Sequence, residues 1–159
     1  MHPLQDAQDV QRLLEQARDR LGQIAEVDGT DEASWWVGFH HGGGFAVEWS
    51  GPWACVVFTA GLGLPPPGGE LAALNLALSY NALWREVGHL RIARDGDQGE
   101  LMLIGELGPD DGDPDTFNAA LLHFESLQRW WSDAMARAAQ PAGPGAATGI
   151  DQALLLGRI

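Results

Sequence analysis

A regular alternation of large apolar side chains between residues 34 and 60 limits what this chain can fold into more than any other feature. The segments "SWWVGFHH" and "FAVEW" place apolar residues at every second position, namely Trp35, Val37 and Phe39 in the first and Phe45, Val47 and Trp49 in the second. Alternate residues of a β-strand share one face. The intervening "GGG" and "SGP" suit tight turns. The sequence therefore predicts a meander of three antiparallel strands, with the apolar segment "WACVVFTA" as its more central member.

Two helices are predicted outside this meander. Residues 4–21 repeat apolar side chains at helical spacing, and Gly22 is placed to end the helix. Near the other end, Asp113 or Asp115 can cap a helix whose apolar stripe continues to about residue 139. The acidic segment between the first helix and the meander, "EVDGTDEAS", is predicted to be a turn.

A third helix, over residues 70–84, has an unusual distribution of apolar side chains. They occupy two faces, with Leu71, Leu74 and Leu78 on one and Leu76, Tyr80 and Leu83 on the other. A helix that is apolar on two faces must be covered on both. A core of this size can cover one face with its own sheet, so we expect a second copy of the chain to cover the other and form a homodimer.

The segment "VGHLRIARDGDQGELMLIGEL" predicts a β-hairpin, because apolar residues alternate on both sides of an Asp-Gly turn. The complete order is α-β-β-β-α-β-β-α, which is an α+β fold with a twisted antiparallel sheet and three helices. We predict one domain over residues 1–139. Residues 140–159 are expected to be a flexible Gly/Pro/Ala linker followed by a short apolar tail.

Charge narrows the possible partners. The chain of 159 residues has a formal charge of -13 and contains no lysine. An acidic surface repels phosphate backbones and anionic lipids, which disfavours nucleic acids and membranes as partners. No apolar run reaches the roughly 20 residues needed to cross a bilayer, and the N-terminus does not resemble a signal peptide. We therefore expect a soluble, cytoplasmic protein, whose single cysteine, Cys55, packs as a small hydrophobic residue.

The segment His41-Gly42-Gly43-Gly44 raises the possibility of an esterase, because it is similar to the loop that forms the oxyanion hole of lipases. Such enzymes also need a Gly-x-Ser-x-Gly nucleophile elbow, and none of the serines has glycines at both flanking positions. A hairpin turn is the better interpretation. The histidines and acidic loops likewise lack the spacing of a metal site. We predict no enzymatic activity and no cofactor or metal.

Tryptophan is the remaining unusual feature. Four of the seven tryptophans, Trp35, Trp36, Trp49 and Trp53, fall in the predicted meander. Trp35 and Trp36 are adjacent on a strand, so one faces the core and the other faces away. A second face that carries large aromatic side chains can bind a partner. Alternatively, a loop or the tail covers it within the subunit.

The order of elements, the stretch "TAGLGLPPP", the helix "LAALNLALSYNALW" with Asn81, and the closing "FNAALLHFESLQRWW" together resemble the class I type III secretion chaperones of the CesT/SycE (Tir chaperone) type. The resemblance covers residues 4–139. It implies a homodimer that binds the N-terminal segment of a secreted effector in extended form, keeps it soluble for export, and acts alongside the export apparatus.

The resemblance also implies residue roles. The second helix and the strand after it form the dimer interface in that family, which gives four candidates here: Leu76, Tyr80, Leu83 and Trp84. Effector contacts use apolar patches of the first helix and the sheet together with strand addition, which gives the candidates Leu13, Leu14, Trp36, Phe39 and Trp49. A regulatory or sensory binding module with the same fold, but without a role in secretion, is the alternative, and a small esterase is a more remote one.

Overall fold

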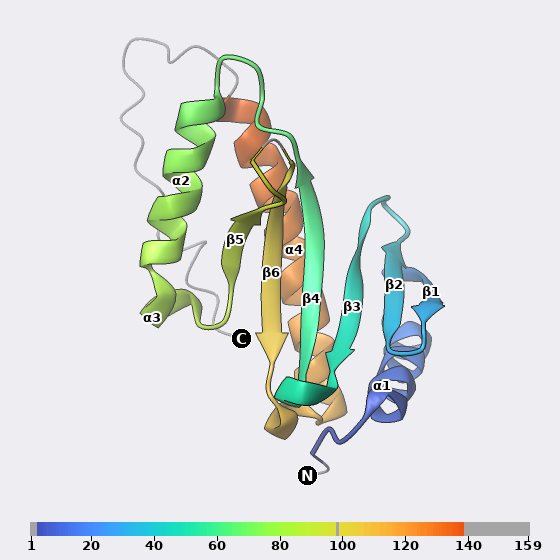
Figure 1. Ribbon diagram of the computed structural model, residues 1–159. Helices are drawn as coiled ribbons and strands as arrows, with labels where there is room; N and C mark the ends of the chain where they lie inside the picture. Colours follow the sequence, from blue (N-terminus) through green and yellow to red (C-terminus); the bar gives the residue numbers. More distant parts are fainter. Residues whose placement is uncertain (1–2, 98, 139–159) are drawn as a thin grey trace.

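A six-stranded antiparallel sheet forms the centre of the molecule (Figure 1). The computed structural model describes residues 3–97 and 99–138. Its strand order is β1-β2-β3-β4-β6-β5. The strands are β1 (Ile24–Asp31), β2 (Ser34–Phe39), β3 (Gly44–Ser50), β4 (Cys55–Gly63), β5 (Arg91–Arg94) and β6 (Leu101–Leu107). The helices are α1 (Ala7–Arg20), α2 (Glu70–Ala82), α3 (Trp84–Val87) and α4 (Pro114–Ala138).

The predicted α+β class and antiparallel sheet are confirmed, but two elements were missed. The segment predicted to be an acidic turn is the hairpin partner of β2, since β1 pairs with β2 from Ile24↔Phe39 to Asp31↔Ser34. Its acidic composition is unfavourable for a strand in isolation, and pairing with β2 outweighs that preference. The predicted helix over 70–84 ends at Ala82 and is followed by the short helix α3.

Helices cover one face of the sheet. The long helix α4 crosses behind the strands in Figure 1, and α1 lies beside it behind β1 and β2. Between this helix layer and the sheet lies an aromatic core, in which Phe124 contacts both Phe45 and Phe58 with ring centroids 4.8 and 5.4 Å apart. A Cβ at Gly105 of β6 would lie only 3.1 Å from the Phe124 ring, so this glycine makes room for it.

The helix caps explain where the two long helices begin. Asp6 accepts hydrogen bonds from the backbone N–H groups of Gln8 and Asp9 at the start of α1. Asp113, one of the two predicted caps of α4, accepts from the backbone N–H of Thr116 at 3.1 Å. That hydrogen bond is the main reason why the pKa of Asp113 is lowered. Each cap satisfies N–H groups that have no partner within the helix.

Trp53 was predicted to begin a strand, but it lies outside the strands. It lies in a 3-10 turn, Gly51–Trp53, between β3 and β4, and its side chain is exposed. The following residue, Ala54, adopts the left-handed conformation with φ 47°. The apolar run from Trp53 therefore begins its strand two residues later, at Cys55, and the rest of it is central as predicted, since β4 lies between β3 and β6.

Candidate functional site

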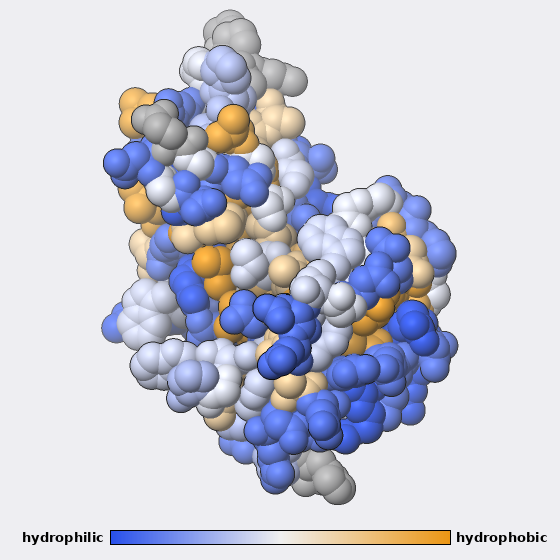
Figure 2. Space-filling view, turned by 45° about the vertical axis from the view of Figure 1, so that its right-hand side comes forward, coloured by the Kyte–Doolittle hydropathy of each residue, from blue (hydrophilic) through white to orange (hydrophobic). Residues whose placement is uncertain are grey.

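The face of the sheet opposite α1 and α4 is open. The strand register aligns one row of side chains across this face: Asp28, Trp36, Ala46, Thr59, Ile104 and Arg91. Small and apolar residues occupy the middle of the row, and charged residues occupy its two ends. Figure 2 shows apolar side chains gathered over the middle of the molecule, with hydrophilic residues dominating below them.

Glycines keep the open face flat. The indole of Trp36 lies across Gly44, where a Cβ would come within 2.7 Å of Trp36 Cζ2. In the same way, a Cβ at Gly38 would come within 2.9 Å of the Glu26 side chain. Trp36 remains 38% exposed, whereas its neighbour Trp35 is 5% exposed on the covered face. The prediction that these two tryptophans point to opposite sides is confirmed.

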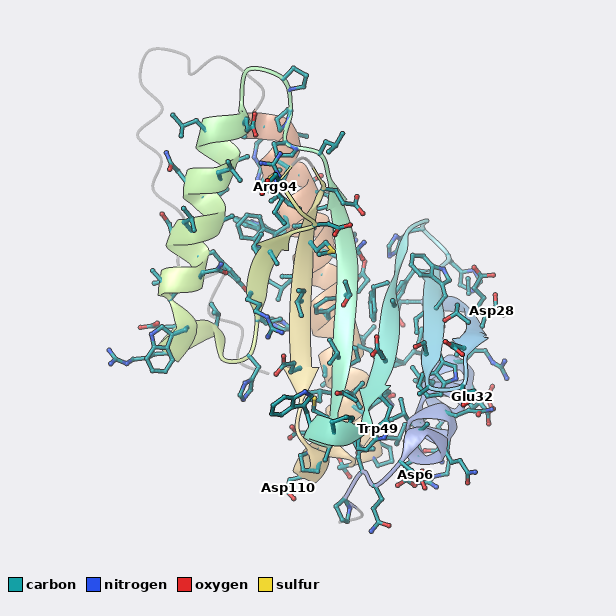
Figure 3. The ribbon with its side chains drawn as sticks, in the orientation of Figure 1. Asp6, Asp28, Glu32, Trp49, Arg94 and Asp110 are labelled. Atoms are coloured by element: carbon teal, nitrogen blue, oxygen red, sulfur yellow. The ribbon has the colours of Figure 1, made fainter. Side chains whose placement is uncertain are left out.

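The candidate effector contacts divide into two groups. Leu13, Leu14 and Phe39 are buried between the sheet and the helices. Trp36 is exposed on the open face, and Trp49 is half-buried near the end of β3 (Figure 3). Periodicity identified the apolar face of α1 correctly, but that face packs on the subunit's own core. Of the five candidates, the two tryptophans are therefore the accessible ones in this conformation.

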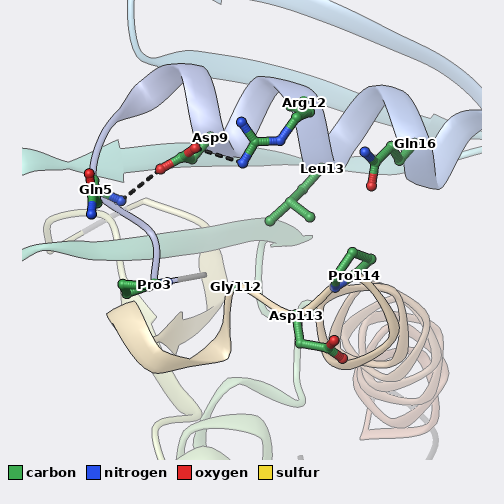
Figure 4. Close-up of a pocket in the computed structure, with 9 residues that line it drawn as sticks. All are labelled: Pro3, Gln5, Asp9, Arg12, Leu13, Gln16, Gly112, Asp113 and Pro114. Carbon is green, nitrogen blue, oxygen red and sulfur yellow. Dashed lines mark hydrogen bonds and ion pairs between the residues drawn. The ribbon is translucent and has the colours of Figure 1, made fainter. Parts of the chain in front are cut away.

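A hollow of about 520 Å³ lies between α1 and the beginning of α4 (Figure 4). Leu13 points into it from α1, and polar side chains surround it. Among them, Asp9 pairs with Arg12 at 2.6 Å and accepts a hydrogen bond from the Gln5 backbone N–H at 3.0 Å. The Gln5 hydrogen bond and then the Arg12 guanidinium lower the pKa of Asp9. The hollow joins residues far apart in sequence, so no local pattern could have revealed it.

The exposed face of α2 lies opposite the face that carries the dimer candidates Leu76, Tyr80 and Leu83. Leu76 and Leu83 are half-buried, and Tyr80 is buried against Trp131, with ring centroids 5.1 Å apart. Burial raises the pKa of Tyr80 to about 12. Trp84 is 62% exposed, and the residues that form the outward apolar face are Leu71 and Leu78, which are 74% and 68% exposed. Apolar residues therefore occupy two faces of the helix as predicted, and of the four dimer candidates Trp84 is exposed while Tyr80 is buried within the subunit.

The His41–Gly44 segment connects β2 to β3, with Gly44 as the first residue of β3, as the hairpin interpretation predicts. Gly42 and Gly43 have φ angles of 93° and 79°, which glycine adopts without strain. The Gly42 N–H donates to Phe39 O at 2.9 Å, so it is already used within the turn.

Helix α4 fixes this turn through one carboxylate. Oε1 of the buried Glu125 lies 2.8 Å from His41 Nε2 and 2.6 Å from Arg129 Nε, although neither contact has hydrogen-bond directionality. Oε2 of the same carboxylate accepts from Arg129 Nη2 at 3.3 Å.

Over residues 3–97 and 99–138, no group of three or more His, Cys, Asp and Glu side chains is arranged to hold a metal ion. Within the same ranges, no helix has the length and apolar character to cross a bilayer.

The open sheet face carries the exposed Trp36, and α2 carries an outward apolar face. Exposed apolar patches of this kind are typical of surfaces that contact other proteins. The Tir chaperone protein (CesT) family matches residues 13–131, and the chain belongs to that family. No curated protein sequence matches it significantly.

Solved structures show the same fold at low sequence identity. The ExsC–ExsE complex is 16% identical with a TM-score of 0.65, over 81% of this chain and 95% of that chain. The HopA1–SchA chaperone–effector complex is 12% identical with a TM-score of 0.60, over 80% of this chain and 95% of that chain. YbjN from E. coli is 16% identical with a TM-score of 0.53, over 80% of this chain and 92% of that chain.

Proposed function

We propose that this protein is a type III secretion chaperone of the bacterial cytoplasm. It binds the N-terminal chaperone-binding segment of a secreted effector in extended form and keeps that segment soluble and ready for export. The observation that carries the proposal is the match of the Tir chaperone family over residues 13–131. The open sheet face with the exposed Trp36 supports it, because an unfolded segment needs apolar surface to bind.

The experiment that tests this function is co-expression with candidate secreted proteins, followed by mass measurement of the eluted complex. We expect one secreted protein to be retained, and its N-terminal segment alone to be sufficient for retention. Limited proteolysis of the complex should leave that segment protected while the rest of the effector is cleaved. A chaperone that elutes without any secreted protein contradicts the proposal.

We also propose that the functional unit is a homodimer formed through α2. Leu71, Leu78 and Trp84 are large, apolar and exposed on one subunit, which is unfavourable unless a partner covers them. Light scattering should give twice the mass of one chain. The double variant Leu71→Asp/Leu78→Asp should be monomeric, because it places carboxylates in the contact. Ala136→Asp on the exposed side of α4 is the control and should stay dimeric.

A binding module without a role in secretion is the second candidate. It is favoured by the fold of YbjN from E. coli, a proposed transcription regulator. This candidate predicts a folded partner or a ligand in place of an extended segment. Hydrogen exchange of the purified complex separates the two, because an extended segment of an effector is protected only where it touches the chaperone.

A further inference from the structure

Helix α4 and the open face lie on opposite sides of the sheet, and we propose that α4 positions Trp36 for binding of the effector segment, here called the client. The contacts concerned are those of Gln128 with Gly44 and of Glu125 with His41. The inference rests on the proposed function, because it names residues that prepare the client-binding face. These residues act through Trp36 and do not touch the client.

Gly44, the first residue of β3, is contacted from both sides of the sheet. On the open face, the Trp36 indole lies so close that a Cβ at Gly44 would come within 2.7 Å of Trp36 Cζ2. From the covered side, Gln128 Nε2 donates a hydrogen bond to Gly44 O at 3.0 Å. The indole therefore packs on a residue whose carbonyl group is held by α4, and a shift of Gly44 changes the surface beneath Trp36.

Without that contact, the turn between β2 and β3 would fix Gly44 only weakly. Pairing of the two strands ends at Gly38 and Gly44, and the ends of paired strands open most readily. The preceding Gly42 and Gly43 have φ angles of 93° and 79°, and glycine loses more conformational freedom on folding than any other residue. Side-chain contacts from α4 offset part of this entropic cost.

A second contact holds the other side of this pair of glycines. Oε1 of the buried Glu125 lies 2.8 Å from His41 Nε2, and the His41 ring stacks on Phe39 with ring centroids 5.7 Å apart. Glu125 and Gln128 are three residues apart on α4, so they share one side of the helix. The two contacts therefore hold the turn at His41 and at Gly44, on either side of the two glycines.

A fixed turn lowers the free-energy cost of client binding. Trp36 is 38% exposed, so part of its indole is available to a partner while the rest packs on Gly44. A partner that binds a mobile side chain must immobilise it, and holding that side chain in the bound position beforehand removes part of this cost. We therefore expect loss of either α4 contact to weaken client binding several-fold, which is less than the effect of removing the indole itself.

The first test observes Trp36 in the absence of a client. The protein is labelled with 5-fluorotryptophan, and the fluorine NMR resonance of Trp36 is assigned by comparison with Trp36→Phe. Gln128→Met keeps a similar side-chain length and helix propensity but removes the hydrogen-bond donor. We expect the Trp36 resonance to broaden or split in this variant.

The matched control is Gln11→Met on the exposed side of α1. It also removes one side-chain hydrogen bond, the one that Gln11 Nε2 donates to Glu15 at 3.0 Å, and it should leave the Trp36 resonance unchanged. Gln128→Asn, whose side chain is one methylene shorter, gives the same test if Gln128→Met does not fold.

Two adjacent histidines test the second contact. His41→Phe keeps a ring that can stack on Phe39 but removes the nitrogen that contacts Glu125. His40→Phe makes the same replacement one residue earlier, at a position that is also exposed. We expect His41→Phe to broaden the Trp36 resonance and His40→Phe to leave it as it is in the parent protein.

The second test measures binding of the N-terminal effector segment that co-expression identifies, by isothermal titration calorimetry. Gln128→Met should weaken this binding several-fold when Trp36 is present. Trp36→Ala/Gln128→Met should bind as weakly as Trp36→Ala alone, because the effects of two residues are not additive when one acts through the other. A general loss of structure would instead weaken binding equally in both backgrounds.

A Trp36 resonance that is the same in Gln128→Met, in His41→Phe and in their two controls overturns the inference and leaves the proposed function intact. Equal weakening by Gln128→Met with and without Trp36 overturns the inference as well, because Gln128 then acts on the fold as a whole. Failure to retain any secreted protein in co-expression is the separate result that overturns the proposed function.

Discussion

Adjacent residues of the same strands form the two faces of the sheet, but helices cover only one of these faces. On the covered face, Trp35 is aligned with Val47, Phe58 and Gly105, and the helices bury this row. On the open face, Trp36 is aligned with Ala46, Thr59 and Ile104, and no described helix covers it. The comparison shows that alternation divides side chains between two faces, while the placement of the helices decides which face becomes core.

Substitution of the two adjacent tryptophans gives the largest expected difference. Trp35→Ala should lower the free energy of unfolding by about 3–5 kcal/mol, because it leaves a large cavity in the core. Trp36→Ala should lower it by about 1 kcal/mol or less, and should instead weaken client binding at least tenfold. Urea denaturation and pull-down of the client measure the two effects. Similar losses of stability in both variants contradict the division of the sheet into a core face and a binding face.

The flatness of the open face can be tested at Gly44. Gly44→Ala should cost about 1–3 kcal/mol, because its Cβ would collide with the Trp36 indole and the Val37 carbonyl oxygen. Gly22→Ala is the control, since nothing lies within 4 Å of its Cβ position. Thermal unfolding compares the two variants. Quenching of Trp36 fluorescence by iodide should also increase in Gly44→Ala, because the displaced indole becomes more exposed.

Glutamate-to-glutamine substitutions compare a buried carboxylate on the covered side of the sheet with a carboxylate on its open face. Glu125 on α4 is buried beside His41 and Arg129, so Glu125→Gln should destabilise the protein by about 1–3 kcal/mol. Glu106 pairs with Arg91 at 2.6 Å on the open face, where solvent screens the pair. Glu106→Gln should therefore cost less than about 1 kcal/mol. Denaturant unfolding measures both losses of stability as shifts of the midpoint at an unchanged slope. A larger loss of stability for Glu106→Gln than for Glu125→Gln would mean that the open face is covered in solution.

The smallest effect concerns pH. Burial lowers the pKa of His123 on α4 below its value of 6.5 in an unfolded chain. Below pH 6.5 the unfolded state binds a proton that the folded state does not yet accept, so stability falls as the pH drops through this window. Above this pH window the contribution of His123 to stability is constant. His123→Gln should flatten this part of the stability curve, and an unchanged slope in that variant would assign the effect to another group.

Most of the fold could be predicted because its signals are local. The meander, the hairpin of β5 and β6 and the Asp113 cap each depend on residues close in sequence. β1 was not predicted because most of its residues are exposed, so it lacks the alternation of apolar side chains that marks a strand. Its acidic residues are also typical of turns.

The candidate site was harder to predict, since it depends on which faces pack together. Leu13, Leu14 and Phe39 have the pattern of an apolar surface, but α4 and the sheet cover them. The burial of Tyr80 could not be predicted for the same reason, because it packs against Trp131 of α4 and no spacing rule shows that contact. The opposite orientation of Trp35 and Trp36 was predicted correctly, because adjacent residues of a strand point to opposite faces, but which of the two faces is open could not be predicted.

The position of α4 has a consequence for synthesis of the chain. Its residues Phe124 and Trp131 complete the core, and Gln128 Nε2 donates to Gly44 O at 3.0 Å across 84 residues of sequence. A nascent chain on the ribosome therefore exposes the apolar side of β4, as well as the open face, until this helix has emerged. Until then the chain is incompletely folded and prone to aggregate. A truncation before Pro114 should therefore form insoluble protein.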